Sequence, residues 1–212
     1  MRRWLHPIWR GPARGGPALD VLLEPCFVAV DLETTGLDPH RDAVVAAAAI
    51  PVRGGVPEPG YVTLVDPGRP IPEASSAIHG ITDAMVTGAP PIGTVLDSLT
   101  GVWGDAILVG HGVAFDLAVL AREARARGRR PPGNPTLCTM RLVAALHPDW
   151  TEVTLDTVAA RLGVVVRDRH TARGDAEAAA AILMTLLPVL RGRGVTTFSE
   201  VFWLQSSARL EP

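Results

Sequence analysis

The sequence predicts an α/β fold in which a central mixed five-stranded sheet is flanked by helices. Continuous apolar runs of strand length occur, and CFVAVDLE at 26–33 is typical of a strand buried on both faces. Amphipathic helical segments also occur, of which FDLAVLAREARARG at 115–128 is the clearest. Three predicted strands come first, and helices then alternate with two more. That order indicates a mixed sheet between helices.

The remaining elements follow from local patterns along the chain. The segment VPEPGYVTLVDPG at 56–68 alternates well enough for a strand and ends in a Pro-Gly turn signal. Gly128 and Pro131 end the amphipathic helix, and Pro188 marks an end or a kink in the last helix. Further strands are predicted at 42–52, 105–111 and 164–166. Further helices are predicted at 91–104, 134–148, 154–163 and 174–190.

Composition limits the domain organisation and the kind of partner. The 212 residues suffice for one α/β domain, placed at 25–190 between a Pro/Gly/Arg-rich arm at 1–24 and a short tail at 191–212. Apolar runs are too short for a membrane span and no signal-like stretch is evident, so we expect a cytoplasmic protein without membrane contact. The formal net charge of −2 does not suit a protein that coats nucleic acid. A nucleic-acid enzyme of this charge needs a small site in which metal ions supply positive charge.

Two acids, Asp31 and Glu33, stand two positions apart at the end of the first predicted strand. Because side chains alternate along a strand, both carboxylates can point to one place on the same face. Two unpaired carboxylates so close would repel each other, and a divalent cation such as Mg²⁺ or Mn²⁺ resolves that conflict. A solvated pair of acids at a strand end is the alternative for an isolated match.

More acids stand at comparable places downstream. Asp116 lies near the first turn of a predicted helix, after an apolar strand and a Gly-rich turn. Asp175 opens the Ala-rich last helix, and His170 precedes it by five residues. Taken singly, each acid could be explained by the favourable position of a carboxylate at a helix start. Taken together with Asp31 and Glu33, they indicate one site.

Three segments resemble the sequence motifs of a known family. VDLETTGL at 30–37 is similar to the first motif of the DEDDh 3′→5′ exonucleases, the DnaQ-like group that includes the epsilon subunit of bacterial DNA polymerase III. GHGVAFD at 110–116 resembles the second motif and HTARGDA at 170–176 the third, while AIHGIT at 77–82 resembles an element between the first two. The resemblance covers roughly residues 26–188. Several ordered motifs at suitable spacing are far more specific than one short pattern.

The resemblance implies an RNase H-like fold and a two-metal site. By that resemblance two Mg²⁺ or Mn²⁺ ions are held by four acids, and His170 is the general base. The four acids are Asp31, Glu33, Asp116 and Asp175. Hydrolysis of a phosphodiester needs a group that removes a proton from water near neutral pH, and a histidine suits this task because its ordinary pKa is about 6.5. A surface histidine in a charged Arg-Asp-Arg-His loop is the alternative.

The same resemblance suggests contacts to the substrate. Candidate substrate-binding residues are Thr34, Thr35, Leu37, His79, His111 and Phe115. Core or supporting roles remain open for His79 and Phe115, and His111 could orient the loop that follows it. Arginines in REARARGRR at 122–130 either meet the phosphate backbone or form a solvated helix face. Gly112 departs from the family pattern, which usually has Asn there, and removes a hydrogen-bonding side chain.

The sequence therefore predicts a metal-dependent 3′→5′ exonuclease that releases nucleoside monophosphates from single-stranded or frayed DNA ends, in proofreading or repair. An RNA-directed exonuclease of the same group is one alternative, because the motifs do not distinguish the sugars. A non-catalytic module that binds 3′ ends is another, and a missing acid would be its signature. Association with a DNA polymerase is not indicated by the short tail at 191–212.

Overall fold

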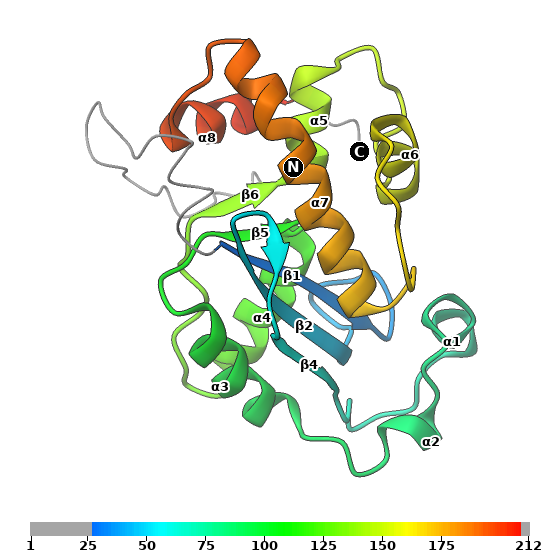
Figure 1. The fold of residues 1–212 in the computed structure, drawn as a ribbon. Coiled ribbons are helices and arrows are strands. Elements are labelled where there is room, and N and C mark those ends of the chain that lie inside the picture. The colour runs from blue at the N-terminus through cyan, green and yellow to red at the C-terminus, as the bar shows by residue number, and fades with distance from the viewer. Residues whose placement is uncertain (1–26, 209–212) are drawn as a thin grey trace.

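The computed structural model describes residues 27–208, and a mixed six-stranded sheet lies at its centre (Figure 1). The strand order is β3-β2-β1-β5-β6, and β4 also pairs with β2. β1 is antiparallel to β2 and parallel to β5, and β5 is parallel to β6. The strands are β1 Phe27–Thr34, β2 Val44–Arg53, β3 Val56–Pro57, β4 Tyr61–Leu64, β5 Leu108–Gly110 and β6 Thr136–Cys138.

Helices pack on both faces of the sheet (Figure 1). The long helix α7 crosses β1 and β2 on one face, whereas α3 and α4 cover the other. The helices are α1 Glu73–His79, α2 Asp83–Val86, α3 Ile92–Trp103, α4 Ala114–Ala126, α5 Thr139–Leu146, α6 Leu155–Leu162, α7 Ala172–Gly192 and α8 Phe198–Ser207. Within residues 27–208, no helix combines the length and the apolar character that crossing a membrane requires.

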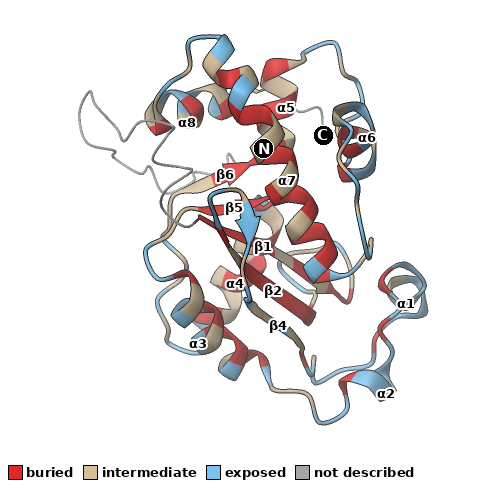
Figure 2. Ribbon diagram, in the orientation of Figure 1, coloured by how far each residue is buried: buried red, intermediate tan, exposed pale blue. Residues whose placement is uncertain are grey.

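Two hydrophobic cores, one on each face of the sheet, fix the direction of the side chains of β1. Phe27 and Ala29 belong to the core beneath α7, and Val28 and Val30 belong to the core beneath α3 and α4. Figure 2 shows that the central strands and the inner side of α7 are the buried parts of the molecule. Because side chains alternate along a strand, the face of Phe27 and Ala29 continues into the acids at the end of β1.

The predicted α/β architecture is confirmed, with differences at the edge of the sheet. The predicted strand at 164–166 is wrong: this run follows the left-handed cap Gly163 and does not enter the sheet, with Val164 and Val166 packed on the core and Val165 exposed. β6 takes its place from the start of the predicted helix at 134–148, which begins only at Thr139. β3 and β4 both fall within the single strand predicted at 56–68, so the sheet has six strands.

The segment at 191–212, which was predicted as a short tail, includes the last residues of α7 and the whole of α8. α7 continues through Pro188 to Gly192, so Pro188 does not end the helix. α8 lies within the segment predicted as a tail and packs against α5 and β6. Its Gln205 side chain accepts a hydrogen bond from Cys138 N–H and donates to the Thr136 carbonyl, each at 2.8 Å. The predicted arm at 1–24 lies outside the described residues.

Candidate active site

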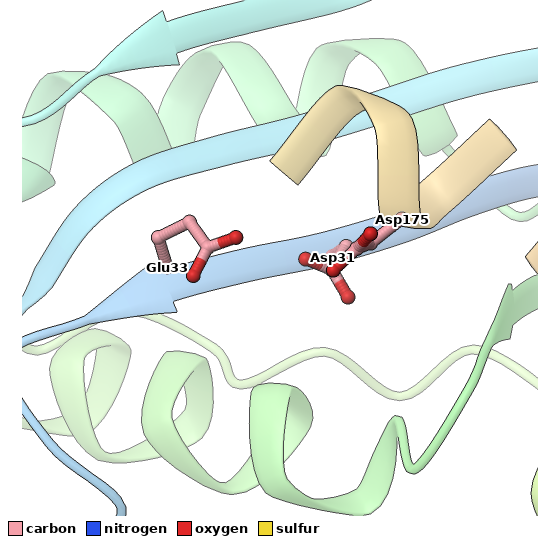
Figure 3. Close-up of side chains that lie close together, drawn as sticks. All are labelled: Asp31, Glu33 and Asp175. Atoms are coloured by element: carbon pink, nitrogen blue, oxygen red, sulfur yellow. The ribbon is translucent and has the colours of Figure 1, made fainter. Parts of the chain in front are cut away.

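Three carboxylates converge where β1 ends beneath the start of α7. One oxygen each from Asp31, Glu33 and Asp175 lies within 4.8 Å of the others (Figure 3). Asp31 and Glu33 share a face of β1, as the alternation of a strand requires. Asp175 comes from the first turn of α7, 142 residues beyond Glu33 in numbering (175 − 33). The fold therefore brings together acids that are far apart in the sequence.

The first turn of α7 is held in place by its cap and by a glycine. Thr171 is the N-cap residue, and its hydroxyl accepts a hydrogen bond from Gly174 N–H at 3.0 Å. A Cβ atom at Gly174 would lie 2.2 Å from the carbonyl oxygen of Asp168 and 2.4 Å from that of Arg167. Only glycine fits at this contact, which presses the turn that carries His170 against the helix that carries Asp175.

Asp116 reaches the site from the opposite side of β1. It lies in the first turn of α4, and its Oδ1 accepts a hydrogen bond from Leu32 N–H at 3.0 Å. Asp116 is 6% exposed, so it is one of the few buried acids among the described residues. Asp116 is not part of the three-carboxylate group, but its charge raises the pKa values of Asp31 and Glu33. The backbone of β1 thus anchors the fourth acid next to the cluster.

Burial is the largest cause that disfavours the charged form of each of the four acids. Repulsion from other acids of the site adds to it at Asp31, Glu33 and Asp116, whereas Arg169 and His170 partly offset it at Asp175. The pKa of Glu33 and that of Asp116 are each raised to about 7. The pKa of Asp31 is raised well above its ordinary value, and that of Asp175 is raised too. A set of acidic oxygens with unfavourable mutual charge fits a hard divalent cation, because such a cation is bound by carboxylate oxygens.

His170 lies beside Asp175 in the turn before α7. Its backbone adopts a left-handed conformation with φ of 61°, which is uncommon outside glycine and costs of order 1–2 kcal/mol. The backbone N–H of His170 donates to Asp175 Oδ1 at 3.3 Å. This contact supports the conformation and fixes the imidazole next to an acid of the cluster. Strained backbone of this kind is frequent at functional sites.

Arg169 takes part in this site, although the sequence pattern did not predict it as a site residue. Its guanidinium donates to the carboxylate of Asp175 and, through Nε, to Asp156 Oδ1 at 2.7 Å. Its Nη1 also lies 3.2 Å from His170 Nδ1. The only signal in the sequence is the Arg-Asp-Arg-His run at 167–170, whose composition is also that of a charged surface loop. The partner Asp156, at the start of α6, becomes visible only in the fold.

The hydroxyls of Thr34 and Thr35 are engaged within the loop that follows β1. Thr34 Oγ1 donates to the Gly36 carbonyl at 2.6 Å, and Thr35 Oγ1 bonds to Asp42 Oδ1 and Ala43 N–H, both at 3.0 Å. Leu37 projects from this loop and is 88% exposed. The loop geometry therefore favours backbone contacts at the threonines and a free apolar side chain at Leu37, and their roles toward substrate stay predictions.

The two histidines predicted as substrate contacts have different surroundings. His79 is buried, and its Nδ1 accepts a hydrogen bond from Ile81 N–H at 3.0 Å. Its Nε2 is enclosed by protein, and a hydrogen-bond contact of the ring with the Thr34 backbone raises the pKa of His79 against the larger, lowering effect of burial. His111 contacts Thr139 Oγ1 at 2.9 Å and the Val153 carbonyl at 2.8 Å, so both of its ring nitrogens have protein partners. The structure favours an orienting role for His111. The role of His79 toward a substrate stays a prediction, because its Nε2 is buried and the Thr34 backbone contacts the ring.

Phe115 and Gly112 complete the predicted set at the start of α4. Phe115 is partly buried and packs against the core beneath α3 and α4, which is the supporting role left open for it. Gly112 has φ of +80°, and a Cβ atom there would have Met140 Cε as its nearest neighbour, at 3.9 Å. This is a backbone conformation in which Asn is tolerated better than most residues.

The arginines of α4 and the turn after it bind mainly to the protein itself. Arg122 donates to the Pro39 carbonyl at 2.8 Å and so ties α4 to the loop of Leu37. Arg127 pairs with Glu123, and Arg129 with Asp97 at 2.7 Å. These contacts favour a structural role over the predicted contact with a phosphate backbone.

Comparison with known proteins gives a consistent result. The family model described as Exonuclease (RNase_T) matches residues 28–183. DNA polymerase III subunit epsilon of Aquifex aeolicus is 36% identical over 171 residues, which cover 81% of this chain and 85% of that protein. A DNA polymerase III subunit epsilon-like protein of Rhodobacter capsulatus is 43% identical over 180 residues, but the chain spans only 25% of its length.

Solved structures agree on the fold. Exonuclease X in complex with 5′ overhanging duplex DNA is 26% identical, with a TM-score of 0.67, and the match covers 84% of this chain and 99% of that one. Exonuclease I of E. coli in complex with a dT13 oligonucleotide, at 18% identity and a TM-score of 0.67, shares the fold over 80% of this chain and 42% of its own. The predicted RNase H-like fold is confirmed, and the chain belongs to the exonuclease family of the RNase_T model.

Proposed function

We propose that this protein is a metal-dependent 3′→5′ exonuclease that hydrolyses phosphodiester bonds at the 3′ ends of DNA and releases nucleoside monophosphates. The observation that carries the proposal is the convergence of Asp31, Glu33 and Asp175 beside His170. The relatives named as epsilon subunits, and the exonuclease X structure with DNA, support DNA as the substrate.

The four acids and His170 have different roles in the proposed hydrolysis. Asp31, Glu33, Asp116 and Asp175 would hold two divalent cations, Mg²⁺ or Mn²⁺. When bound, such ions activate water and stabilise the charge that develops on the phosphate. His170 accepts the proton of the attacking water through a ring nitrogen. His79 lines the pocket of the terminal nucleotide, and Leu37 packs against its base.

An RNA-directed exonuclease of the same family remains the second candidate, because no described contact selects a 2′-hydroxyl. A non-catalytic 3′-end-binding module is disfavoured, since each predicted acid is present at the site or anchored next to it. We place the enzyme in the cytoplasm, in proofreading or repair. Association with a polymerase is an extension of this proposal that the name of the Aquifex relative supports.

Digestion of matched oligonucleotides tests the proposal. DNA and RNA of one sequence, labelled at either the 5′ or the 3′ end, are incubated with the full chain in Mg²⁺, in Mn²⁺ or with a chelator. We expect a ladder from 5′-labelled DNA and immediate release of mononucleotide from 3′-labelled DNA, both abolished by chelator. Preference for RNA would establish the second candidate, and cleavage that survives chelation would refute the metal assignment.

A further inference from the structure

Arg169 places one guanidinium between two parts of the proposed catalytic site. Its Nη1 donates to the Asp175 carboxylate and lies 3.2 Å from His170 Nδ1. Its Nε donates to Asp156 Oδ1 at 2.7 Å, which joins the turn before α7 to α6. The arginine side chain is 28% exposed, whereas that of Asp175 is 10% exposed. The Asp156 side chain is 59% exposed. Arg169 therefore pairs with a nearly buried acid through Nη1 and with an exposed acid through Nε.

The contact with Asp175 occupies a carboxylate that faces the acidic cluster. Asp175 Oδ2 binds the guanidinium, and Oδ1 accepts the His170 N–H at 3.3 Å. Figure 3 shows the Asp175 carboxylate next to that of Asp31. A guanidinium and a divalent cation both neutralise carboxylates, and they cannot share the same lone pairs. A carboxylate has about four lone pairs, so a cation displaces Arg169 when it binds Asp175 Oδ2 on the side that the guanidinium occupies.

The contact with His170 also fixes the position of the ring proton. An arginine only donates hydrogen bonds, so His170 Nδ1 must be the acceptor. In a neutral ring the proton then resides on Nε2. A nitrogen that carries a proton has no lone pair with which to take another from water. The hydrogen bond from Arg169 therefore engages the Nδ1 lone pair, which is the ring lone pair of this tautomer that could accept a proton.

We propose that Arg169 neutralises Asp175 in place of a divalent cation in the metal-free enzyme and is displaced when such a cation binds. This inference rests on the proposed function, because it assumes that the acids bind the cation. Displacement frees Asp175 and His170 Nδ1 together, so that cation binding and activation of the base occur in one movement. The Nε contact with Asp156 keeps the displaced arginine attached to α6.

Titration of the full chain with Mn²⁺, followed by calorimetry and by the electron-spin signal of free Mn²⁺, tests the inference. Arg169→Gln removes the competitor, and we expect it to raise Mn²⁺ affinity by about tenfold, as expected for loss of one charge-assisted contact. Arg173→Gln is the matched control, because it also removes one positive charge near the start of α7. Arg173 pairs with Glu177 rather than with an acid of the cluster, and its side chain is 62% exposed. We expect it to leave the affinity within about twofold of wild type.

Three results would overturn the inference. Equal affinity of Arg169→Gln and wild type would make Arg169 a structural residue, and weaker binding would make it part of the metal site. An equal gain in Arg173→Gln would reduce the effect to general charge. Failure of the proposed function has a different signature, because Mn²⁺ would then bind to neither protein, or would bind equally well after Asp31→Asn.

The ring proton supplies a readout that does not depend on affinity or activity. Nitrogen-15 spectra of the imidazoles report the tautomer of each histidine, and the His170 signals are assigned by their loss in His170→Asn. We expect the metal-free wild type to carry the His170 proton on Nε2 and Arg169→Gln to lose that preference. A proton on Nδ1 in the metal-free wild type would contradict the contact between Arg169 and His170.

Discussion

The carbonyl oxygen of Asp168 lies against Gly174 so closely that an added Cβ atom would approach it to 2.2 Å. The same carbonyl accepts hydrogen bonds from the backbone N–H and the hydroxyl of Thr171, at 3.2 and 2.7 Å. The turn at 167–170 is therefore closed onto the first turn of α7, and this closure places His170 beside Asp175.

Gly174→Ala should destabilise the protein, although the same change in a helix ordinarily stabilises it by about 0.5–1 kcal/mol. The added methyl group must push the 167–170 turn away, which costs about 1–3 kcal/mol and moves His170. We expect a lower melting temperature together with loss of nuclease activity. Gly101→Ala in α3 is the control, because a Cβ atom there meets nothing within 4 Å. Equal behaviour of the two variants would show that the contact is unimportant.

Asp31→Asn should separate stability from activity. Burial and three neighbouring carboxylates raise the pKa of Asp31, so its negative charge destabilises the folded protein when no cation is bound. Removal of that charge should raise the melting temperature in chelator by about 2–4 °C, or roughly 1 kcal/mol for a domain of this size. Nuclease activity should fall by more than about a hundredfold, because changes at residues that merely support a metal ligand already cost about 10- to 100-fold.

Asp97→Asn is the surface control for this change, since the Asp97 side chain is 66% exposed and pairs with Arg129. Asp97→Asn should change neither the melting temperature nor the nuclease activity appreciably. Full activity of Asp31→Asn at ordinary Mg²⁺ would remove Asp31 from the site. A lower melting temperature in chelator would mean that its charge is compensated in the metal-free state.

The pH dependence of stability follows from the raised pKa values at the cluster. The pKa of Glu33 is about 7 in the folded protein, against an ordinary value of 4.5, and that of Asp116 is about 7 against 3.8. The folded state therefore binds these protons more tightly than the unfolded state. Their stabilising effect is complete below the ordinary values and is lost as pH rises to about 7.

Denaturant titrations in chelator between pH 5 and pH 8 measure this loss. Two histidines, the buried His79 and the half-buried His111, have lowered pKa values and act in the opposite direction below their ordinary value of 6.5. Comparison with Glu33→Gln isolates the carboxylate, and we expect the variant to lose less free energy of unfolding across the range than wild type. Excess Mg²⁺ should oppose the decline, because a cation binds deprotonated carboxylates. Identical slopes for the two proteins would contradict the raised pKa of Glu33.

The strand that carries Asp31 and Glu33 was predictable because its physical basis is local. An apolar run of strand length and a period of two define both the element and the shared face of the two acids. Asp116 and Asp175 were predictable for a different reason, since each stands in the first turn of a helix that the sequence marks clearly. The resemblance to a family then assigned the four acids to one site.

Features that depend on a distant partner could not be predicted in this way. Three residues of β6 carry no period of their own, and they form a strand because β5 offers a parallel edge. The outer edge of β6 is capped by the Gln205 side chain, which leaves no backbone partner there for the apolar run at 164–166. Arg169 belongs to the same class, because its contacts with Asp156 and Asp175 arise only when α6 and α7 pack together.

Gly112→Asn should restore a contact that this chain lacks relative to the family pattern. The backbone at Gly112 has φ of +80°, which Asn adopts at lower cost than most residues, and its nearest obstacle to a Cβ atom is Met140 Cε at 3.9 Å. The variant should therefore fold with little change in melting temperature. The amide adds a hydrogen bond near the start of α4, and we expect KM for single-stranded DNA to fall several-fold while kcat changes less. Gly112→Ala supplies the same Cβ atom without the amide, at a strain of about 1 kcal/mol, and should not lower KM. If the two variants had the same KM, the amide would have no role in substrate binding, and the glycine would be explained by its backbone conformation alone.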